Sequence, residues 1–369
     1  MMSKNPFTPA FGSEPYCLAG REQIIEDILG GLDNGPGDPN RACILIGPRG
    51  SGKTVLLSKI AFEASRAGWI AASVTAAGGM LDKIEEQIEY NGKHLLPAKE
   101  KSRLTELYAF GVGLSTENVG ERKPSWRMQM TRFLEIFAEN GAGLLITVDE
   151  IDSKLSEMVE LVSDFQHFIR EKRDVALVMA GLPGKALRMF QDDKISFTRR
   201  AFQHTLKAIG KADVKTAIRK TIESSGRLIE NDALEAAADY SEGYPFLIQL
   251  VGYNIWRQSP ANEVITLKDA INGIESSEDH METMILDTTV RDLSEKDLEF
   301  LIAMLPDKGE SRIADITKRL GCMPNAAGQY RLRLIKQGVI EEYGRGRVRF
   351  AMPLLKEYLA KSYSHRARG

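Results

Sequence analysis

The stretch that most constrains the fold is residues 44–54, which read ILIGPRGSGKT. An apolar run comes before it and helical apolar spacing follows it, so a buried strand leads through a glycine-rich loop into a helix. The spacing G-x-x-x-x-G-K-[ST] is met at every fixed position. Glycines let the backbone curl so that successive N–H groups face phosphate oxygens, and the helix N-terminus adds partial positive charge. We therefore predict a phosphate-binding loop made of Gly47, Pro48, Arg49, Gly50, Ser51, Gly52, Lys53 and Thr54.

The loop also predicts roles for two side chains and a need for acidic partners. Lys53 is expected to reach the β- and γ-phosphates and so to act in catalysis, and the Thr54 hydroxyl is expected to hold Mg²⁺. The apolar run GLLITVDE at 143–150 ends in the required carboxylates. We expect Asp149 to hold the metal, directly or through water, and Glu150 to polarise the attacking water as general base. The predicted ligands are ATP or ADP with Mg²⁺, and the acidic pair favours hydrolysis over transfer to a small acceptor.

Strands and helices alternate along the first 208 residues. Apolar strand patterns are followed by helical patterns, which predicts a parallel sheet with helices on both faces. We assign residues 1–208 to an α/β nucleotide-binding domain and interpret the glycine-interspersed stretch 107–115 as a hairpin insertion. The expected strands are 42–47, 69–76, 143–150, 175–181 and 202–206.

From Lys211 onward the predicted elements are helices. Three helices form an expected lid over 209–265, and a connecting helix over 266–292 is expected to break or bend near Gly273. Residues 293–369 are predicted to form a tail domain of three helices and a hairpin around GRG. That order of elements is typical of a winged helix-turn-helix domain.

The charge is distributed unevenly. The net charge is −2, but residues 311–369 carry 13 Lys or Arg against 4 Asp or Glu, whereas the remaining residues carry 36 against 47. An acidic body with a basic tail indicates a polyanionic partner, although a solvated basic face would give the same count.

The tail also contains a pattern that suggests where such a partner binds. In the last predicted helix, Leu332, Leu334 and Ile335 are expected to face the core and the basic residues to face outward. Arg345, Arg347 and Arg349 occupy alternate positions in the predicted hairpin and would share one face of a strand. The predicted duplex DNA contacts are Gln329, Tyr330, Arg331, Arg333, Lys336, Arg345, Arg347 and Arg349. Alternatively, the tail docks a protein or packs only on its own ATPase body.

Residues Gly20-Arg21-Glu22 open a helix about two dozen residues before the loop. Together with the loop and the Asp-Glu pair, they resemble the AAA+ superfamily. The resemblance is to archaeal origin-recognition-type initiators and their bacterial relatives. It implies that ATP lies between the α/β domain and the lid, with Arg21 bordering the adenine. It also implies that Arg199 or Arg200 is an arginine finger, which would reach the γ-phosphate of the next subunit in a homo-oligomer. The other interpretation is that these arginines are ordinary surface residues.

Two departures from that family concern hydrolysis. The fourth strand ends in MAGLPG, without the usual polar sensor residue, and the lid sequence EGYPFLIQL lacks the usual arginine. Both departures are compatible with slow hydrolysis or a nucleotide-dependent switch. Parts of these segments are more similar to uncharacterised bacterial ATPases and transposition-helper ATPases.

The predicted function is Mg²⁺-dependent ATP hydrolysis coupled to duplex DNA binding. The alternative is a nucleotide-switched regulatory NTPase whose tail binds a protein partner; a small-molecule phosphotransferase is disfavoured by the Asp-Glu pair and the tail. We expect a cytoplasmic protein without a membrane segment, because the apolar runs are strand-sized and the N-terminal residues lack the apolar core of a secretion signal. The three cysteines are scattered and indicate neither disulfides nor zinc.

Overall fold

The computed structural model describes residues 4–10, 12–96 and 125–363 of the 369-residue chain, so the hairpin predicted at 107–115 lies outside the described residues. The chain forms a five-stranded, all-parallel sheet in the order β2-β3-β4-β1-β5. Strand β1 lies between β4 and β5 and places Ile44 opposite Met179 of β4 and Gln203 of β5. The strands are β1 (Ala42–Ile46), β2 (Ile70–Thr75), β3 (Leu144–Asp149), β4 (Val175–Gly181) and β5 (Phe202–Thr205).

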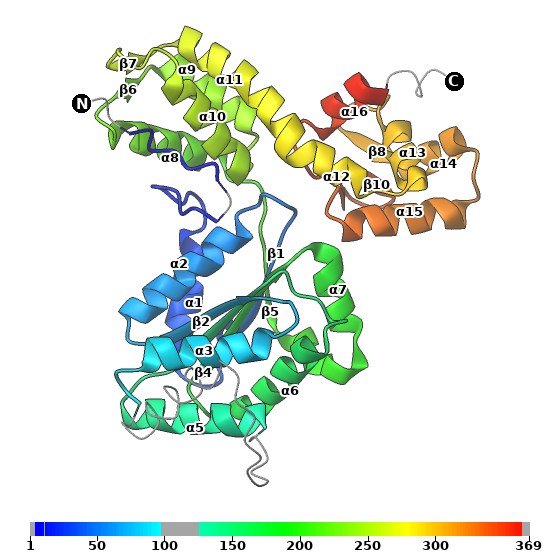
Figure 1. Ribbon diagram of the computed structural model, residues 1–369. Coiled ribbons are helices and arrows are strands. Elements are labelled where there is room, and N and C mark those ends of the chain that lie inside the picture. Colours follow the sequence, from blue (N-terminus) through cyan, green and yellow to red (C-terminus); the bar gives the residue numbers. More distant parts are fainter. Residues whose placement is uncertain (1–3, 11, 97–124, 364–369) are drawn as a thin grey trace, which may run out of the picture.

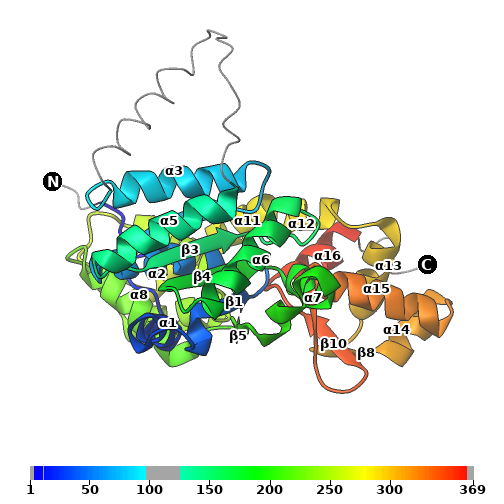
Figure 2. The same cartoon turned by 90° about the horizontal axis from the view of Figure 1, so that it is seen from below.

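Helices cover both faces of this sheet, as predicted (Figures 1 and 2). Successive side chains of β1 point to opposite faces, so Cys43 and Leu45 pack on α1 and α2, while Ile44 and Ile46 face the core that α3, α5, α6 and α7 share. The helices are α1 (Glu22–Asn34), α2 (Lys53–Arg66), α3 (Met80–Gly92), α5 (Trp126–Glu139), α6 (Ser156–Arg170) and α7 (Pro183–Gln191), with 3₁₀ segments at Pro39–Arg41 and Asp193–Arg200.

The lid consists of α8 (Lys211–Glu223), α9 (Asn231–Ser241) and α10 (Pro245–Arg257), joined by the short parallel strands β6 (Leu228–Ile229) and β7 (Val264–Ile265). The N-terminal segment packs on it. Phe7 is buried against α10 where Gly252 has no side chain, and a Cβ there would overlap the Phe7 ring. Asn5 Nδ2 donates a hydrogen bond to Tyr253 O at 3.0 Å. Asn5 and Phe7 therefore anchor this part of the N-terminal segment to the lid.

The connecting helix is interrupted later than predicted. α11 (Leu267–Met281) passes through Gly273 without a break, and the irregularity is a π-helical turn at Glu282–Leu286, followed by α12 (Asp287–Arg291). The expected bend near Gly273 is wrong, because this glycine serves packing: a Cβ there would lie 2.6 Å from the Ile255 Cα. Gly273 therefore allows α11 to approach the backbone of α10 closely.

The tail domain has the predicted order of three helices and a hairpin, with two additions. Strand β8 joins the hairpin in an antiparallel sheet of order β8-β10-β9, and helix α16 follows it. The elements are α13 (Glu295–Met304), β8 (Glu310–Arg312), α14 (Ile313–Leu320), α15 (Pro324–Lys336), β9 (Ile340–Glu342), β10 (Arg347–Phe350) and α16 (Leu355–Tyr363).

The lid, the connecting helix and the tail share one continuous hydrophobic core. The connecting segment, made of α11, the π-helical turn and α12, links the buried side chains of the lid to those of the tail. It contributes Met281, Leu286 and Val290, and the tail contributes residues such as Phe300 and Leu334. Figure 1 shows lid and tail on the same side of the α/β domain. Among the described residues, there is no helix with the length and apolarity needed to cross a membrane.

Candidate functional site

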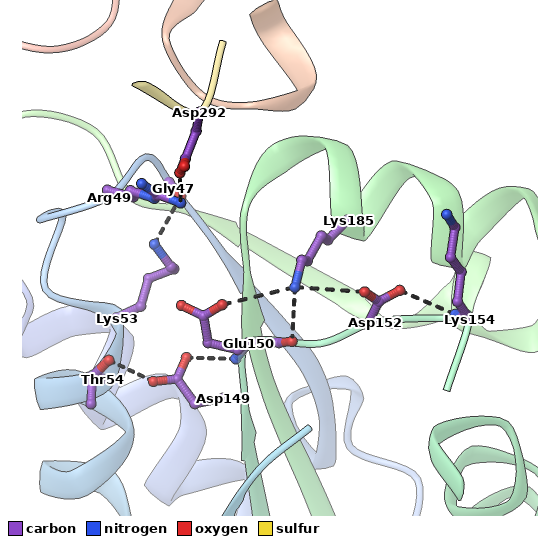
Figure 3. A network of polar contacts seen from close by, with 10 residues as sticks. All are labelled: Gly47, Arg49, Lys53, Thr54, Asp149, Glu150, Asp152, Lys154, Lys185 and Asp292. Atoms are coloured by element: carbon purple, nitrogen blue, oxygen red, sulfur yellow. Dashed lines mark hydrogen bonds and ion pairs between the residues drawn. The ribbon is translucent and has the colours of Figure 1, made fainter. Parts of the chain in front are cut away.

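The phosphate-binding loop leaves the end of β1 and runs directly into α2. Gly50 and Gly52 have φ angles of 73° and 86°, in the left-handed region that glycine adopts without strain. The Lys53 ammonium lies within the curl of the loop and donates hydrogen bonds to Gly47 O at 3.0 Å and Pro48 O at 2.7 Å (Figure 3). The predicted residues thus form a loop with its lysine at the centre.

Burial changes the acidity of this lysine. Removal from water lowers the pKa of Lys53 from its ordinary 10.5 to about 8, while the Asp149 and Glu150 carboxylates act in the opposite direction. The lysine therefore loses its charge at a lower pH than an ordinary lysine does.

The two predicted metal ligands lie together. The Thr54 hydroxyl donates to Asp149 Oδ2 at 2.5 Å, and Asp149 Oδ1 accepts from the Glu150 N–H at 2.8 Å. Mg²⁺ prefers oxygen ligands and often takes one or two from the protein, with the rest from phosphates and water. A hydroxyl and a carboxylate in contact at the end of β3 fit that requirement.

Glu150 occupies the position expected of a general base, and a lysine that we did not predict contacts it. Its backbone is left-handed, with φ 57°, and its side chain is exposed. Lys185 Nζ lies 3.8 Å from Glu150 Oε2 and 3.7 Å from Asp152 Oδ2. Lys185 directly follows the MAGLPG segment in which a sensor residue was sought. It is the first charged side chain after β4, which is the sequence signal by which it could be identified.

A cavity of about 480 Å³ opens beside the loop. Arg21 lies in its wall: it is 7% exposed, and it donates to Lys207 O at 2.7 Å, while its place beside an adenine stays a prediction. Burial lowers the pKa of Arg21. No sequence pattern indicated that residues within 8–10 and 12–19 of the N-terminal segment, and residues of the connecting segment, would also line this cavity. From the connecting segment come Met284, Ile285 and Thr288.

The lid contacts the loop through the start of α10. The Tyr244 hydroxyl donates to Arg49 O, and the Phe246 N–H donates to Gly50 O at 3.2 Å. A Cβ at Gly50 would lie 2.5 Å from the Tyr244 hydroxyl oxygen. Burial raises the pKa of Tyr244, so this hydroxyl remains a donor. The lid lacks the arginine usual in the family, but it supplies a tyrosine that bonds the phosphate loop.

The two arginine-finger candidates lie outside this cavity. Arg199 donates to Phe190 O at 2.6 Å and pairs with Asp193 at 3.1 Å, and neither Arg199 nor Arg200 lines the cavity wall. A role in another subunit's site therefore stays a prediction.

The predicted DNA contacts differ in their surroundings. Arg345 lies in the turn before β10 and not on the strand face expected for it. Tyr330 packs on the tail core beneath the Arg333 guanidinium, and Gln329 is exposed. Four of the arginines have acidic partners within the tail: Arg331 with Glu342, Arg333 with Asp297, Arg347 with Glu310 and Arg349 with Glu341.

The expectation that Leu332 faces the core is wrong. Its side chain is 47% exposed, whereas Leu334 is fully buried and Ile335 is partly buried. In an α-helix, residues two positions apart lie about 200° apart around the axis. Leu332 and Leu334 therefore point to nearly opposite faces.

Comparison with known proteins places the fold. A family model described as a domain of unknown function (DUF8462) matches residues 283–359. The chain matches no curated protein sequence. It is similar in structure to the Walker-type ATPase PABY2304 of Pyrococcus abyssi, with TM-score 0.67, 16% identity and coverage of 93% of this chain and 96% of that chain. It is also similar to the ORC2 protein of Aeropyrum pernix in its ADPNP-ADP complexes, with TM-score 0.61, 13% identity and 98% coverage of both chains. These likenesses confirm the predicted fold class, a parallel sheet with helices on both faces followed by a helical region.

Proposed function

We propose that this protein binds ATP with Mg²⁺ and hydrolyses it to ADP and phosphate. The observation that carries the proposal is one constellation at the ends of β1 and β3: the Lys53 ammonium in a glycine-rich loop, the Thr54–Asp149 hydrogen bond, and Glu150 beside them. The fold it shares with a Walker-type ATPase and with a protein solved in nucleotide complexes supports this function.

Each residue has a distinct part in the reaction. Water forms a bond to the γ-phosphorus, the bond from that phosphorus to the β–γ bridging oxygen breaks, and ADP leaves with the electron pair. Glu150 takes the proton of the attacking water and later returns it to solvent. Lys53 balances charge on the β- and γ-phosphate oxygens. Thr54 and Asp149 would hold Mg²⁺, which when bound neutralises phosphate charge.

The test separates binding from turnover. Lys53→Ala is expected to abolish nucleotide binding, whereas Glu150→Gln should bind ATP and not hydrolyse it. Glu160→Gln is a matched control, since Glu160 is exposed on α6 and does not line the cavity. Binding is measured with a fluorescent ATP analogue and turnover by phosphate release. Full turnover by Glu150→Gln would exclude Glu150 as the base, and undiminished binding by Lys53→Ala would exclude the loop.

For the tail we propose contact with duplex DNA, supported by the excess of basic residues over 311–369. Gln329 and Arg345 are exposed candidates, and the ion-paired arginines would exchange carboxylate for phosphate partners. Affinity should then fall steeply with salt. Replacing Arg345, Arg347 and Arg349 with Ala should weaken binding and flatten the salt dependence, and an unchanged slope would exclude the hairpin as the contact.

A protein partner is the second candidate, and one observation favours it. The exposed face of α15 includes Leu332, and Met323 at its N-cap is 75% exposed. Exposed apolar side chains beside neutralised arginines suit a protein surface better than phosphates. Leu332→Ser together with Met323→Ser should leave DNA affinity unchanged if DNA is the partner. If the double variant lost DNA affinity while the triple arginine variant kept it, a DNA contact through these arginines would be excluded.

The arginine-finger role is proposed for Arg199 or Arg200 in a homo-oligomer. Exposed arginines before β5 would reach a neighbouring subunit's phosphates. The specific hydrolysis rate should then rise with protein concentration, and each Arg→Ala variant identifies the active residue by losing that rise. A rate per subunit independent of concentration would exclude a finger acting between subunits.

A further inference from the structure

Lys185 contacts the carboxylate of the proposed general base. Its ammonium contacts three oxygens: Glu150 Oε2 at 3.8 Å, Glu150 O at 3.5 Å and Asp152 Oδ2 at 3.7 Å. Figure 3 shows Lys185 between the side chains of Glu150 and Asp152, while the nearby Lys154 side chain points away from Glu150. These contacts hold the Glu150 carboxylate on the side of the site where α7 begins.

Gly184, the residue before Lys185, packs against the tail domain. Gly184 is buried in the first turn of α7, and a Cβ there would overlap both the Cβ and the Cα of Lys336, at the end of α15. Gly338, just after α15, lies against Pro48 of the phosphate loop: a Cβ on it would be 3.3 Å from the Pro48 Cα. Figures 1 and 2 both show α15 beside α7. The tail thus rests on the helix that supplies Lys185.

This interface has features of a contact that opens. Beside it, Arg49 of the phosphate loop forms a salt bridge with Asp292, at the end of the connecting segment, at 3.2 Å. Both side chains are exposed, so this salt bridge contributes little to stability. Six buried side-chain polar atoms of the described residues have no hydrogen-bond partner, and two of the six lie in α7 and just after α15, which meet here: Arg188 Nε, one turn after Gly184, and Gln337 Oε1, next to Lys336. Buried polar atoms without partners weaken the contact that buries them.

We propose that Lys185 is a positioning residue that couples seating of the tail on α7 to the hydrolysis step. With α15 seated on Gly184, α7 holds Lys185 on Glu150 and hydrolysis is slowed. When a partner of the tail lifts α15 away, α7 relaxes, Lys185 leaves Glu150, and the carboxylate is free to take the proton of the attacking water. The inference rests on the proposed ATPase function.

The first experiment removes the restraint. Lys185→Met should raise kcat by roughly two- to fivefold, which is the effect expected of one partly exposed ion pair. The KM for ATP should not change, because Lys185 is not among the cavity-lining residues. Lys185→Arg should keep the rate near wild type, because it keeps the charge. Lys154→Met is the matched control on the loop after β3.

The second experiment removes the docking. Gly184→Ala favours α7 itself, since alanine is the better helix former, and disturbs only the contact with Lys336. It should raise kcat by the same factor as Lys185→Met, and the double variant should show no further increase. Small-angle X-ray scattering on the full chain should show a larger radius of gyration for Gly184→Ala than for wild type, independently of activity.

The outcomes are distinguishable. A fall in kcat for Lys185→Met would overturn the proposal, since the reaction would then need the lysine. Multiplying effects of the two substitutions would overturn the coupling, as would an unchanged radius of gyration for Gly184→Ala. If wild type hydrolyses ATP and Glu150→Gln does not, these failures concern the restraint alone. If wild type and both variants all fail to hydrolyse ATP, the proposed function falls together with the restraint.

Discussion

Lys53 makes nucleotide binding sensitive to pH in a predictable direction. Burial lowers the pKa of its ammonium to about 8 in the protein without nucleotide. Phosphate oxygens favour the charged form, so binding raises this pKa. Above about pH 8 the protein must therefore take up a proton when it binds nucleotide, and affinity falls as pH rises through that value.

The magnitude follows from the printed pKa. A group with pKa about 8 is about nine-tenths charged at pH 7, half charged at pH 8 and one-tenth charged at pH 9. ADP affinity should therefore weaken about tenfold between pH 7 and pH 9, or about 1.4 kcal/mol. Isothermal titration calorimetry with ADP, in buffers of different ionisation enthalpy, should report uptake of about 0.1 proton at pH 7 and about 0.5 at pH 8.

Lys53→Arg supplies the control, because a guanidinium stays charged throughout this range. The variant binds with whatever affinity its geometry allows, but its affinity should not change between pH 7 and pH 9. A flat pH profile in the wild type would show that Lys53 keeps its charge and that its burial has no consequence for binding. An equal slope in Lys53→Arg would assign the titration to another group.

Three further predictions concern the supports of the site. Arg333→Ala should lower the unfolding free energy of the protein by about 3 kcal/mol, measured by urea denaturation, because it leaves the buried Asp297 carboxylate without its cation. Gly273→Ala should destabilise by about 1–2 kcal/mol in the same assay, because overpacking against Ile255 outweighs the gain in helix propensity. Gly50→Ala should weaken nucleotide binding roughly tenfold in a fluorescence titration, since a left-handed alanine costs about 1–2 kcal/mol.

The phosphate loop and its acidic partners could be predicted because their signals are local. The loop is defined by spacing within eight residues, and Asp149 and Glu150 by their place at the end of an apolar run. A parallel sheet brings the carboxyl ends of its strands to one edge, so the loop that follows β1 and leads to Thr54 lies close to Asp149 at the end of β3.

In the tail, a charge count does not show which basic side chains are paired with acidic ones. Arg333 and Asp297 are 36 residues apart, and only the packing of α13 against α15 brings them together. Arg349 and Glu341 meet because the two strands of the hairpin pair in that register. The net charge of the segment was read correctly, but the distribution of free cations depends on tertiary contacts that no local pattern encodes. The same holds for Lys185, whose role depends on the position of α7.

The phosphate loop is also the surface on which the other two domains rest, and this links nucleotide binding to the tail. Tyr244 of the lid bonds Arg49 O, and Gly338 of the tail lies on Pro48. The Lys53 ammonium meanwhile bonds Gly47 O and Pro48 O, contacts that it must exchange for phosphate oxygens. Lid and tail share one core through the connecting segment. Both therefore contact the loop that would hold the phosphates, and for the tail this contact lies beside the one that α15 makes with α7.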